Sequence, residues 1–194
     1  MAPGAAGGRP GFPGDFDAVL AQARTNEPDA WNRLYRWLAP GVAGYLRMLG
    51  AHEVDDLTSE VLLAVFRRVE SFEGSETNFR SWVFTVAHSR LIDERRRRNR
   101  RPDLAPIDDA ADPSDSGPST EDTALRALDV ARIEAICAQL PEEQRAVVLL
   151  RVIAELSIDQ VAEVLGKSPG AVKQLQRRGF DKARTLVARE GVTL

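Results

Sequence analysis

The sequence is poor in the residues that build disulfide bonds, metal sites and membrane spans. Its 194 residues include one cysteine, Cys137, and two histidines, His52 and His88. A single cysteine excludes an internal disulfide and a multi-cysteine metal site, because both need a second thiol. No stretch approaches the roughly eighteen consecutive apolar residues of a membrane-spanning helix, so no membrane insertion is expected.

Residues 1–14 lack the apolar core of a signal peptide. Their high content of Gly, Pro and Ala predicts a disordered leader that stands outside the fold. A chain with one cysteine and no targeting or membrane segment is most simply interpreted as a cytosolic protein.

A catalytic constellation is missing as well. His52 and His88 fall in different segments, Cys137 lies in an apolar pattern typical of a core helix, and no Gly-rich phosphate loop of the Walker type is present. A nucleic-acid hydrolase or a small-molecule enzyme would need such groups. We therefore expect a protein that is not an enzyme and that uses no cofactor and no metal.

Charge is distributed unevenly, although the formal net charge is only −3. Residues 88–101 hold seven Arg against two acids, and residues 166–189 hold seven Lys or Arg against one acid. Between them, residues 102–123 hold seven acids and no Lys or Arg. Because clustered basic charge attracts phosphate groups, the two basic blocks predict binding to nucleic acid.

The spacing of apolar residues predicts an all-α protein of two small helical domains. Apolar residues recur mainly at intervals of three and four, and alternation with a period of two is rare. For the first domain, residues 15–101, the expected helices are a pair over 16–49 interrupted near Pro28 and Pro40, one over 54–69, and a long one over 79–98.

Residues 102–123 predict a flexible acidic linker, because a segment so rich in Asp, Ala, Pro and Ser buries too little apolar surface to fold. The second domain then covers residues 124–194. Its first expected helix ends before Pro141, and its second starts at Pro141. Two more helices are expected after residue 156.

Residues 156–183 have the pattern of a DNA-binding helix-turn-helix. Ser157 caps a short helix, Gly166 permits the turn, and Ser168 caps the last helix. A basic amphipathic helix with a solvated outer face is the alternative interpretation, but the order of cap, turn and second cap favours DNA. The positions at the start of the last helix that are expected to reach DNA are Ser168, Pro169, Gly170, Lys173, Gln174, Arg177 and Arg178.

A second candidate surface lies in the long helix of the first domain. Phe79, Trp82 and Phe84 stand at the start of a helix that ends in arginines. Aromatic rings stack on unpaired bases while Arg holds phosphates, so the combination suits single-stranded DNA. The spacing of the aromatics is also typical of a core stripe, which is the favoured interpretation for any single one of them.

The order of these motifs resembles an extracytoplasmic-function (ECF) sigma factor of the sigma-70 superfamily, a dissociable subunit of bacterial RNA polymerase. The resemblance covers roughly residues 16–188, in two domains that match independently and in the same order. The matching segments are DDLTSEVLLAVFRR, SFEG, NFRSWVFTVAHSRLIDERRRR, the acidic linker, LPEEQRAVVLLRV and the helix-turn-helix.

The resemblance implies a role for each domain in a bacterial, cytoplasmic transcription initiation factor. The first domain would bind core RNA polymerase and the minus-ten promoter DNA, with the loop over residues 70–78 capturing a flipped base. The second domain would bind the polymerase flap and read the minus-thirty-five element with its last helix.

Site residues follow from the same resemblance. The residues that would dock on the coiled coil of the largest polymerase subunit are Asp55, Asp56, Leu57, Glu60 and Val61. The residues that would contact minus-ten DNA are Ser75, Asn78, Phe79, Arg80, Trp82, Arg90, Arg95, Arg96 and Arg97.

The resemblance also implies an anti-sigma protein as a partner that would clamp both domains. The helix-turn-helix motif by itself does not separate a sigma factor from a dimeric transcriptional regulator that acts without the polymerase. That regulator would bind a palindromic duplex site and self-associate.

Overall fold

The computed structural model describes residues 11–100 and 121–189, with the side chains of residues 121–129 left aside. Within these ranges the chain forms eight α-helices and one short 3-10 helix, and no strand. The prediction of an all-α protein is confirmed. The predicted leader and acidic linker fall mostly outside the described residues.

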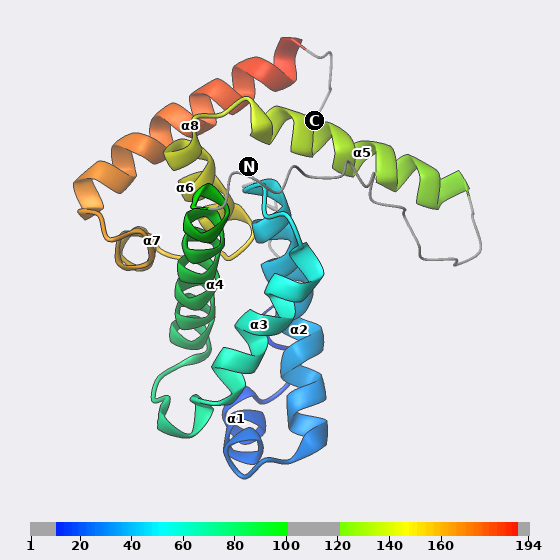
Figure 1. Cartoon of the computed structure of the whole chain (residues 1–194), viewed down its shortest axis with the longest axis vertical. Helices are drawn as coiled ribbons and strands as arrows, with labels where there is room; N and C mark the ends of the chain where they lie inside the picture. Colours follow the sequence, from blue (N-terminus) through cyan, green and yellow to red (C-terminus); the bar gives the residue numbers. More distant parts are fainter. Residues whose placement is uncertain (1–10, 101–120, 190–194) are drawn as a thin grey trace, which may run out of the picture.

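The first domain is built from the helices labelled α1 to α4 in Figure 1. They are α1 (Phe16–Arg24), α2 (Pro28–Met48), α3 (Val54–Phe66) and α4 (Glu76–Asn99), with the 3-10 helix η1 (Val69–Ser71) before α4. Local signals fix their starts. The Asp15 carboxylate accepts a hydrogen bond from Ala18 N, and the Ser75 hydroxyl accepts one from Asn78 N.

The predicted interruption at Pro40 is wrong, because α2 continues through it. Pro40 lies on the exposed side of the helix, where water can reach the carbonyl oxygen that has lost its N–H partner. Leu38, Val42 and Tyr45 anchor the opposite side in the core. Tertiary packing on both sides of the proline therefore outweighs its local preference.

One residue of the predicted leader belongs to the core. Phe12 is 6% exposed and packs edge-on against Trp37, with the ring centroids 5.3 Å apart. Its backbone N–H donates to Glu76 Oε1 at 3.1 Å. The segment that precedes α1 therefore ties the start of α4 to α2.

The second domain contains α5 (Glu121–Ala138), α6 (Glu142–Val152), α7 (Ile158–Leu165) and α8 (Pro169–Arg189). Ser157 and Gln160 form a reciprocal capping box at the start of α7. Gly166 ends that helix with a φ of 61°, a left-handed conformation that glycine adopts without strain. These observations confirm the predicted helix-turn-helix elements.

The two domains pack against each other along α4. Helix α7 lies against α4, and α5 and α6 contact α2 (Figure 1). Most of the buried apolar residues of both domains form one cluster, and Ile136, Leu140 and Leu186 form a second, smaller one between α5 and α8. None of the helices in the described ranges combines the length and the apolar character that a membrane crossing requires.

Candidate nucleic-acid interface

The start of α8 carries an open polar and basic surface. All seven positions predicted to contact minus-thirty-five DNA are exposed there: Ser168, Pro169, Gly170, Lys173, Gln174, Arg177 and Arg178. The Ser168 hydroxyl caps the helix by accepting a hydrogen bond from Ala171 N at 3.2 Å. The structure therefore brings all of these residues together on one helix end.

The packing of the inner face of α8 explains why its basic outer face is exposed to solvent. Val172 is fully buried and Gly179 lies against α6, where a β-carbon would stand 2.7 Å from Val148 Cγ2. Such close approach locks the rotation of α8 about its axis, because only glycine fits. The basic residues consequently point away from the domain, in the arrangement that lets a recognition helix enter a major groove.

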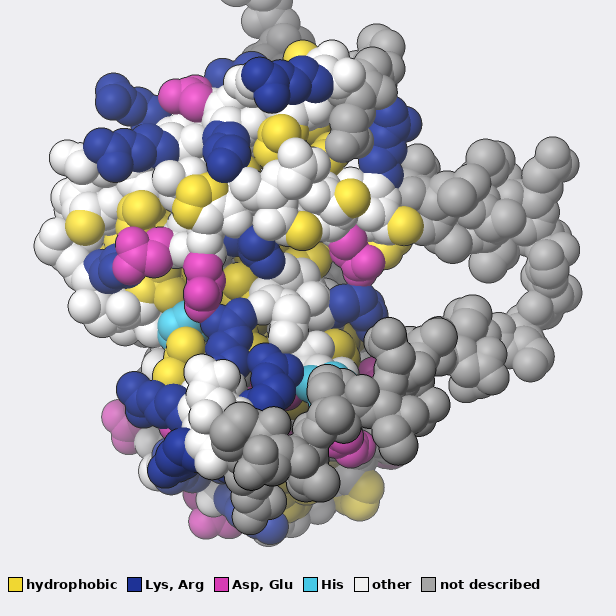
Figure 2. All heavy atoms as spheres, turned by 45° about the horizontal axis from the view of Figure 1, so that its top comes forward, with side chains coloured by type: hydrophobic (Ala, Val, Ile, Leu, Met, Phe, Trp, Pro, Cys, Tyr) yellow, Lys and Arg dark blue, Asp and Glu magenta, His cyan; other side chains and the backbone are white. Residues whose placement is uncertain are grey.

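The residues of α4 that are predicted to contact DNA differ in how exposed they are. Arg90, Arg96 and Arg97 are exposed near its C-terminal end. Arg96 lies 3.8 Å from Asp93, a distance typical of a weak surface pair. Figure 2 shows Lys and Arg side chains in several groups on one face of the molecule, with acidic side chains between them.

The other two predicted arginines are tied into the protein. Arg80 is 12% exposed and pairs with Glu76 at 2.6 Å and with Glu155 at 2.9 Å. Its guanidinium also lies 5.2 Å from the ring centroid of Trp37. Arg95 is 21% exposed and pairs with Glu142 of the second domain. Both arginines are therefore occupied in this arrangement.

The two aromatic residues predicted to contact DNA have different environments. Phe79 has no exposed surface and packs against Phe16 and Phe72. Its packing stabilises the start of α4, in agreement with the interpretation of its spacing as a core stripe. In this structure the buried ring cannot reach a DNA base. Trp82 is half-buried, and its ring is stacked on Phe72 with centroids 5.2 Å apart and an interplanar angle of 16°.

Trp82 also lines a surface hollow of about 410 Å³ beside the loop before α4. Its other lining residues are Arg68, Ser71, Phe72 and Glu73. Arg68 and Phe72 were absent from the residues predicted as DNA contacts. An aromatic residue in a polar loop, close to an arginine, is the signal that could have indicated them.

Ser75 and Asn78 are exposed at the start of α4. The Ser75 hydroxyl lies 3.0 Å from Asn78 Oδ1, so the two side chains hold each other at the end of the loop. Arg24 fixes the other side of the loop by donating to the Phe72 carbonyl oxygen. The loop is thus anchored at both sides of the hollow.

The residues predicted to bind polymerase divide into two sets. Asp55, Asp56 and Glu60 are exposed on α3, whereas Leu57 and Val61 are 4% and 0% exposed and face the core. The buried pair orients the helix and the acids form its outer surface. Only the acidic set is available to a partner in this structure.

An apolar groove of about 360 Å³ lies between α2 and α3, beside these acids. Tyr35 and Leu63 are about half exposed in it, and Phe66 packs against Trp31 with ring centroids 4.4 Å apart. Exposed apolar side chains gathered in one groove are typical of a protein-binding surface. The spacing of apolar residues in the sequence indicated no binding role for Tyr35, Leu63 or Phe66.

Three further side chains, His88, Tyr45 and Cys137, have a shifted pKa. His88 Nδ1 lies 2.9 Å from the Tyr45 hydroxyl, and burial, followed by the charge of Arg95, lowers the pKa of His88. Burial raises the pKa of Tyr45 and also that of the Cys137 thiol. A thiol with a raised pKa is mostly protonated and therefore a poor nucleophile. In the described part of the chain, no three His, Cys, Asp or Glu side chains gather as metal ligands would.

Comparison with known proteins connects both domains to transcription. Residues 24–101 match the family described as Sigma-70 region 2, and residues 131–182 match Sigma-70, region 4. Two ECF RNA polymerase sigma factors are each 33% identical to the chain. ShbA of Streptomyces griseus aligns over 137 residues, which are 70% of this chain and 72% of that protein. SigL of Mycobacterium tuberculosis aligns over 149 residues, which are 76% and 82%.

A solved structure shares the fold. The structure of CnrH in complex with the cytosolic domain of CnrY superimposes with a TM-score of 0.61 and covers 89% of this chain and 96% of that chain. The sequences of the two are 24% identical, so this likeness supports the fold alone.

Proposed function

The chain belongs to the ECF RNA polymerase sigma factors, and from that premise we propose how its two domains divide the recognition of a promoter. The family directs polymerase to promoters, and membership in it does not favour a dimeric regulator that acts alone. In this division α8 binds minus-thirty-five DNA, α4 with its preceding loop binds minus-ten DNA, and α3 binds core polymerase.

The assignment of α8 rests on its open helix end. Lys173, Arg177 and Arg178 are exposed beside the capped N-terminus, where backbone N–H groups also attract phosphates. Gln174 stands among them and is able to pair with an adenine edge. This end of α8 is the part that enters the major groove in a helix-turn-helix protein.

The assignment of α4 rests on the Trp82 ring, the surface hollow that this ring lines, and the exposed arginines of the same helix. Trp82 is accessible at the hollow next to Phe72, and a flipped base could stack there. Arg90, Arg96 and Arg97 lie further along the same helix and would hold the phosphates of the opened strand. Ser75 and Asn78 would border the captured base from the loop.

The assignment of α3 rests on its acidic outer surface and the adjoining apolar groove. Asp55, Asp56 and Glu60 would meet basic side chains on the coiled coil of the largest polymerase subunit. Tyr35, Leu63 and Phe66, which line the groove, would pack against apolar side chains of the same coiled coil. Apolar contact at the centre of an interface with charges around it is the usual anatomy of a protein complex.

Four further properties follow from the same premise. The protein would work in the bacterial cytoplasm, where the polymerase is, and would contribute no catalysis of its own. Its second domain would also contact the polymerase flap. An anti-sigma protein that clamps both domains is the expected inhibitor.

The observation that carries the proposal is the presence of two separate DNA-binding candidates, on α4 and on α8, in one chain. Linking two weak recognitions makes the second contact intramolecular and strengthens both. The test is binding of the purified chain to bacterial core RNA polymerase, followed by run-off transcription on a fragmented genomic library of the host. We expect core binding and promoter-dependent transcripts.

A control chain with Lys173→Ala and Arg177→Ala should still bind core polymerase but lose promoter-dependent transcripts. Failure of the wild-type chain to bind core polymerase, together with binding of free palindromic duplex by a dimer, would contradict the proposal and support the dimeric regulator.

A further inference from the structure

One arginine side chain connects α6 to both helices of the helix-turn-helix. Arg151 lies in the last turn of α6 and is half-buried. Its Nε donates to Gln176 Oε1 on α8 at 3.0 Å. Its Nη1 donates to the carbonyl oxygen of Leu156, the residue before the Ser157 cap of α7. Because each bond requires a defined position of its acceptor, a single guanidinium ties the start of α7 to the middle of α8.

Gln176 places a polar group on the face of α8 that packs against α6. Val172 and Gly179 are buried on that face, and spacings of four and three residues put Gln176 on the same side of the helix. Apolar contacts have little directional preference, whereas a hydrogen bond weakens steeply when its angle is distorted. The bond to Arg151 therefore restricts the tilt of α8, in addition to the rotation that close packing at Gly179 limits.

The connection from α6 to α7 also depends on Arg151. Leu156 is 1% exposed, and a carbonyl oxygen on so buried a residue needs a donor, which the guanidinium supplies. Glu155 precedes it with a φ of 55°, a left-handed conformation that persists in a residue other than glycine only where the surroundings hold it. Hydrogen bonds from inside the second domain therefore help to determine where α7 begins.

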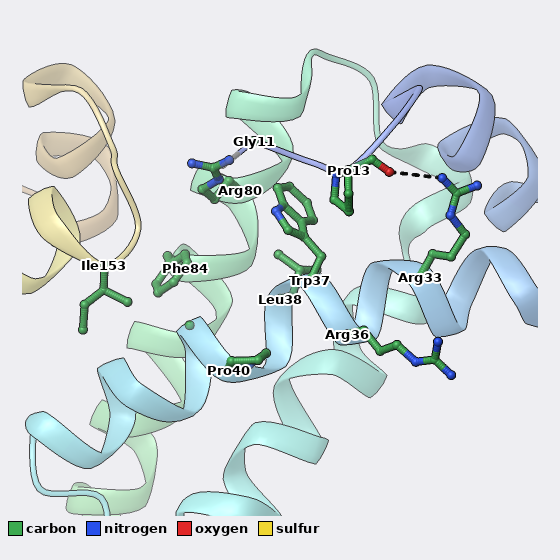
Figure 3. Close-up of a pocket in the computed structure, with 11 residues that line it drawn as sticks. Gly11, Pro13, Arg33, Arg36, Trp37, Leu38, Pro40, Arg80, Phe84 and Ile153 are labelled. Atoms are coloured by element: carbon green, nitrogen blue, oxygen red, sulfur yellow. Dashed lines mark hydrogen bonds between the residues drawn. The ribbon is translucent and has the colours of Figure 1, made fainter. Parts of the chain in front are cut away.

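Packing on the other side of this connection is incomplete. Ile153 lies across from Phe84 of α4 at a cavity of about 450 Å³ (Figure 3). Trp37 and Arg80 border the same cavity. Atoms that border a cavity lack some of the contacts that hold a closely packed atom in place. The position of the connection consequently depends more strongly on the bonds of Arg151.

The side chains of α8 that are candidates for DNA contact stand directly beside Gln176. Lys173 lies nearly one turn before it, Arg177 follows it, and both are exposed. A side chain that reads a base edge has to be held within about 0.5 Å and 10–20° of its productive geometry. A change in the tilt of α8 moves the tips of these long side chains relative to the bases. Recognition by α8 is therefore sensitive to the contact that sets this tilt.

We propose that Arg151 is a positioning residue for recognition of the minus-thirty-five element, which acts through Gln176 and Leu156 and not by touching DNA. The inference rests on the proposed function of α8. The Arg151 bridge holds α7 and α8 at the angle at which the exposed side chains at the start of α8 meet base edges together. A satisfied polar contact suits this task, because it favours one arrangement of the helices over others with similar apolar packing.

Three single variants separate positioning from other roles. Arg151→Lys keeps the charge but lacks the planar fork that reaches both acceptors, so it would preserve a phosphate contact and not a positioning bridge. Gln176→Leu removes the partner on α8 and leaves the arginine in place. Arg145→Lys is the matched control, because Arg145 is a half-buried arginine of the same helix that donates to the carbonyl oxygens of Ala138 and Leu140 at 2.7 and 3.0 Å.

The measurements use the complex of each variant with core polymerase, on a promoter recovered by run-off transcription. One ratio compares the affinity for this promoter with the affinity for a copy whose minus-thirty-five element is scrambled. A second ratio does the same for a scrambled minus-ten element. We expect Arg151→Lys and Gln176→Leu each to lower the first ratio at least about fivefold, which corresponds to one lost base-edge contact, and to leave the second ratio unchanged.

Two further results are expected. The double variant should lose no more than the more affected single variant, because both residues act through one bridge. The Arg145→Lys control should keep the first ratio, even where the midpoint of its urea denaturation falls as far as that of Arg151→Lys.

An unchanged first ratio in Arg151→Lys would overturn the inference. An equal loss in the Arg145→Lys control would also overturn it, because discrimination would then follow general stability. Losses that add in the double variant would show that the two residues act separately, which contradicts a shared bridge. Failure of the proposed function is read from the wild-type chain instead, which would then bind no core polymerase or discriminate neither element, and the inference would fall with it.

Discussion

The outer faces of α8 and α4 both carry basic side chains, yet they differ in what surrounds them. Lys173, Arg177 and Arg178 on α8 are exposed, whereas Arg80 and Arg95 on α4 are 12% and 21% exposed and bound to acids of the other domain. The position of the α8 face is fixed by contacts within its own domain. The α4 face depends on the position of a second domain, so its accessibility can change without any change in its own fold.

The same contrast applies to the aromatic residues of the first domain. Phe79 lies inside and Trp82 lies at the edge of a hollow, although they are three residues apart on one helix. One ring holds α4 in place and the other is available to a base. Substitutions at these two positions should therefore affect different measurements.

The largest expected effect is on folding. Phe79→Ala should lower the free energy of unfolding by about 3–5 kcal/mol, because it leaves a cavity among buried aromatic rings. Urea denaturation followed by circular dichroism measures it. Phe79→Leu, which keeps most of the volume, should cost less than about 1.5 kcal/mol and leave transcription intact. Normal stability with lost transcription in the leucine variant would mean that Phe79 contacts DNA directly.

Trp82→Ala should act mainly on promoter opening. Loss of the stacking surface should weaken capture of an unpaired base by about 1–3 kcal/mol. The measurement is permanganate reactivity of unpaired thymines in the complex with polymerase. Trp82→Phe should restore most of the reactivity, since it keeps a ring. Full opening by the alanine variant would show that Trp82 is only a packing residue.

Gly179→Ala should damage the α8 face while leaving the α4 face unchanged. The added β-carbon would stand 2.7 Å from Val148 Cγ2 and 3.3 Å from the Gln144 carbonyl oxygen, so the helices must move apart. We expect a loss of about 1–3 kcal/mol in urea denaturation. Gly170→Ala is the control for stability, because its β-carbon would meet nothing within 4 Å. Equal stability of the two variants would contradict the close packing of α6 and α8.

The smallest expected effect is a pH dependence of stability near the domain contact. Burial lowers the pKa of His88, so the folded chain resists a proton that the unfolded chain accepts. The free energy of unfolding should therefore fall as the pH drops through the ordinary histidine pKa of about 6.5. Urea denaturation at several pH values measures this slope, and His88→Gln should flatten it. An unchanged slope in that variant would assign the dependence to other groups.

The helix-turn-helix could be predicted from the sequence because its signals are local. Ser157, Gly166 and Ser168 each act within one turn of the chain, and the structure has a cap or a left-handed turn at all three. The α-helical class followed from the same kind of short-range periodicity, whereas the order of the two domains followed from the resemblance of the motifs to a known family. Helix α2 departed from the prediction at Pro40, where contacts from distant residues override a local preference.

The environment of α4 could not be predicted in the same way. Glu155 is 75 residues from Arg80 in the sequence, and no local pattern joins them. The exposure of Tyr35 and Leu63 beside α3 likewise depends on how two helices meet. A period of three or four places Phe79 and Trp82 on similar faces, but only the packing of Phe16 and Phe72 decides which ring is enclosed.

We expect α4 and α8 to act on one promoter when both are attached to the polymerase. Footprinting of the complex with core polymerase, on a promoter recovered by run-off transcription, tests it most directly. We predict protection of two separated elements, with permanganate-reactive thymines only in the element nearer the transcription start. Protection of a single palindromic duplex by the free chain, with no unpaired thymines when polymerase is added, would contradict the claim.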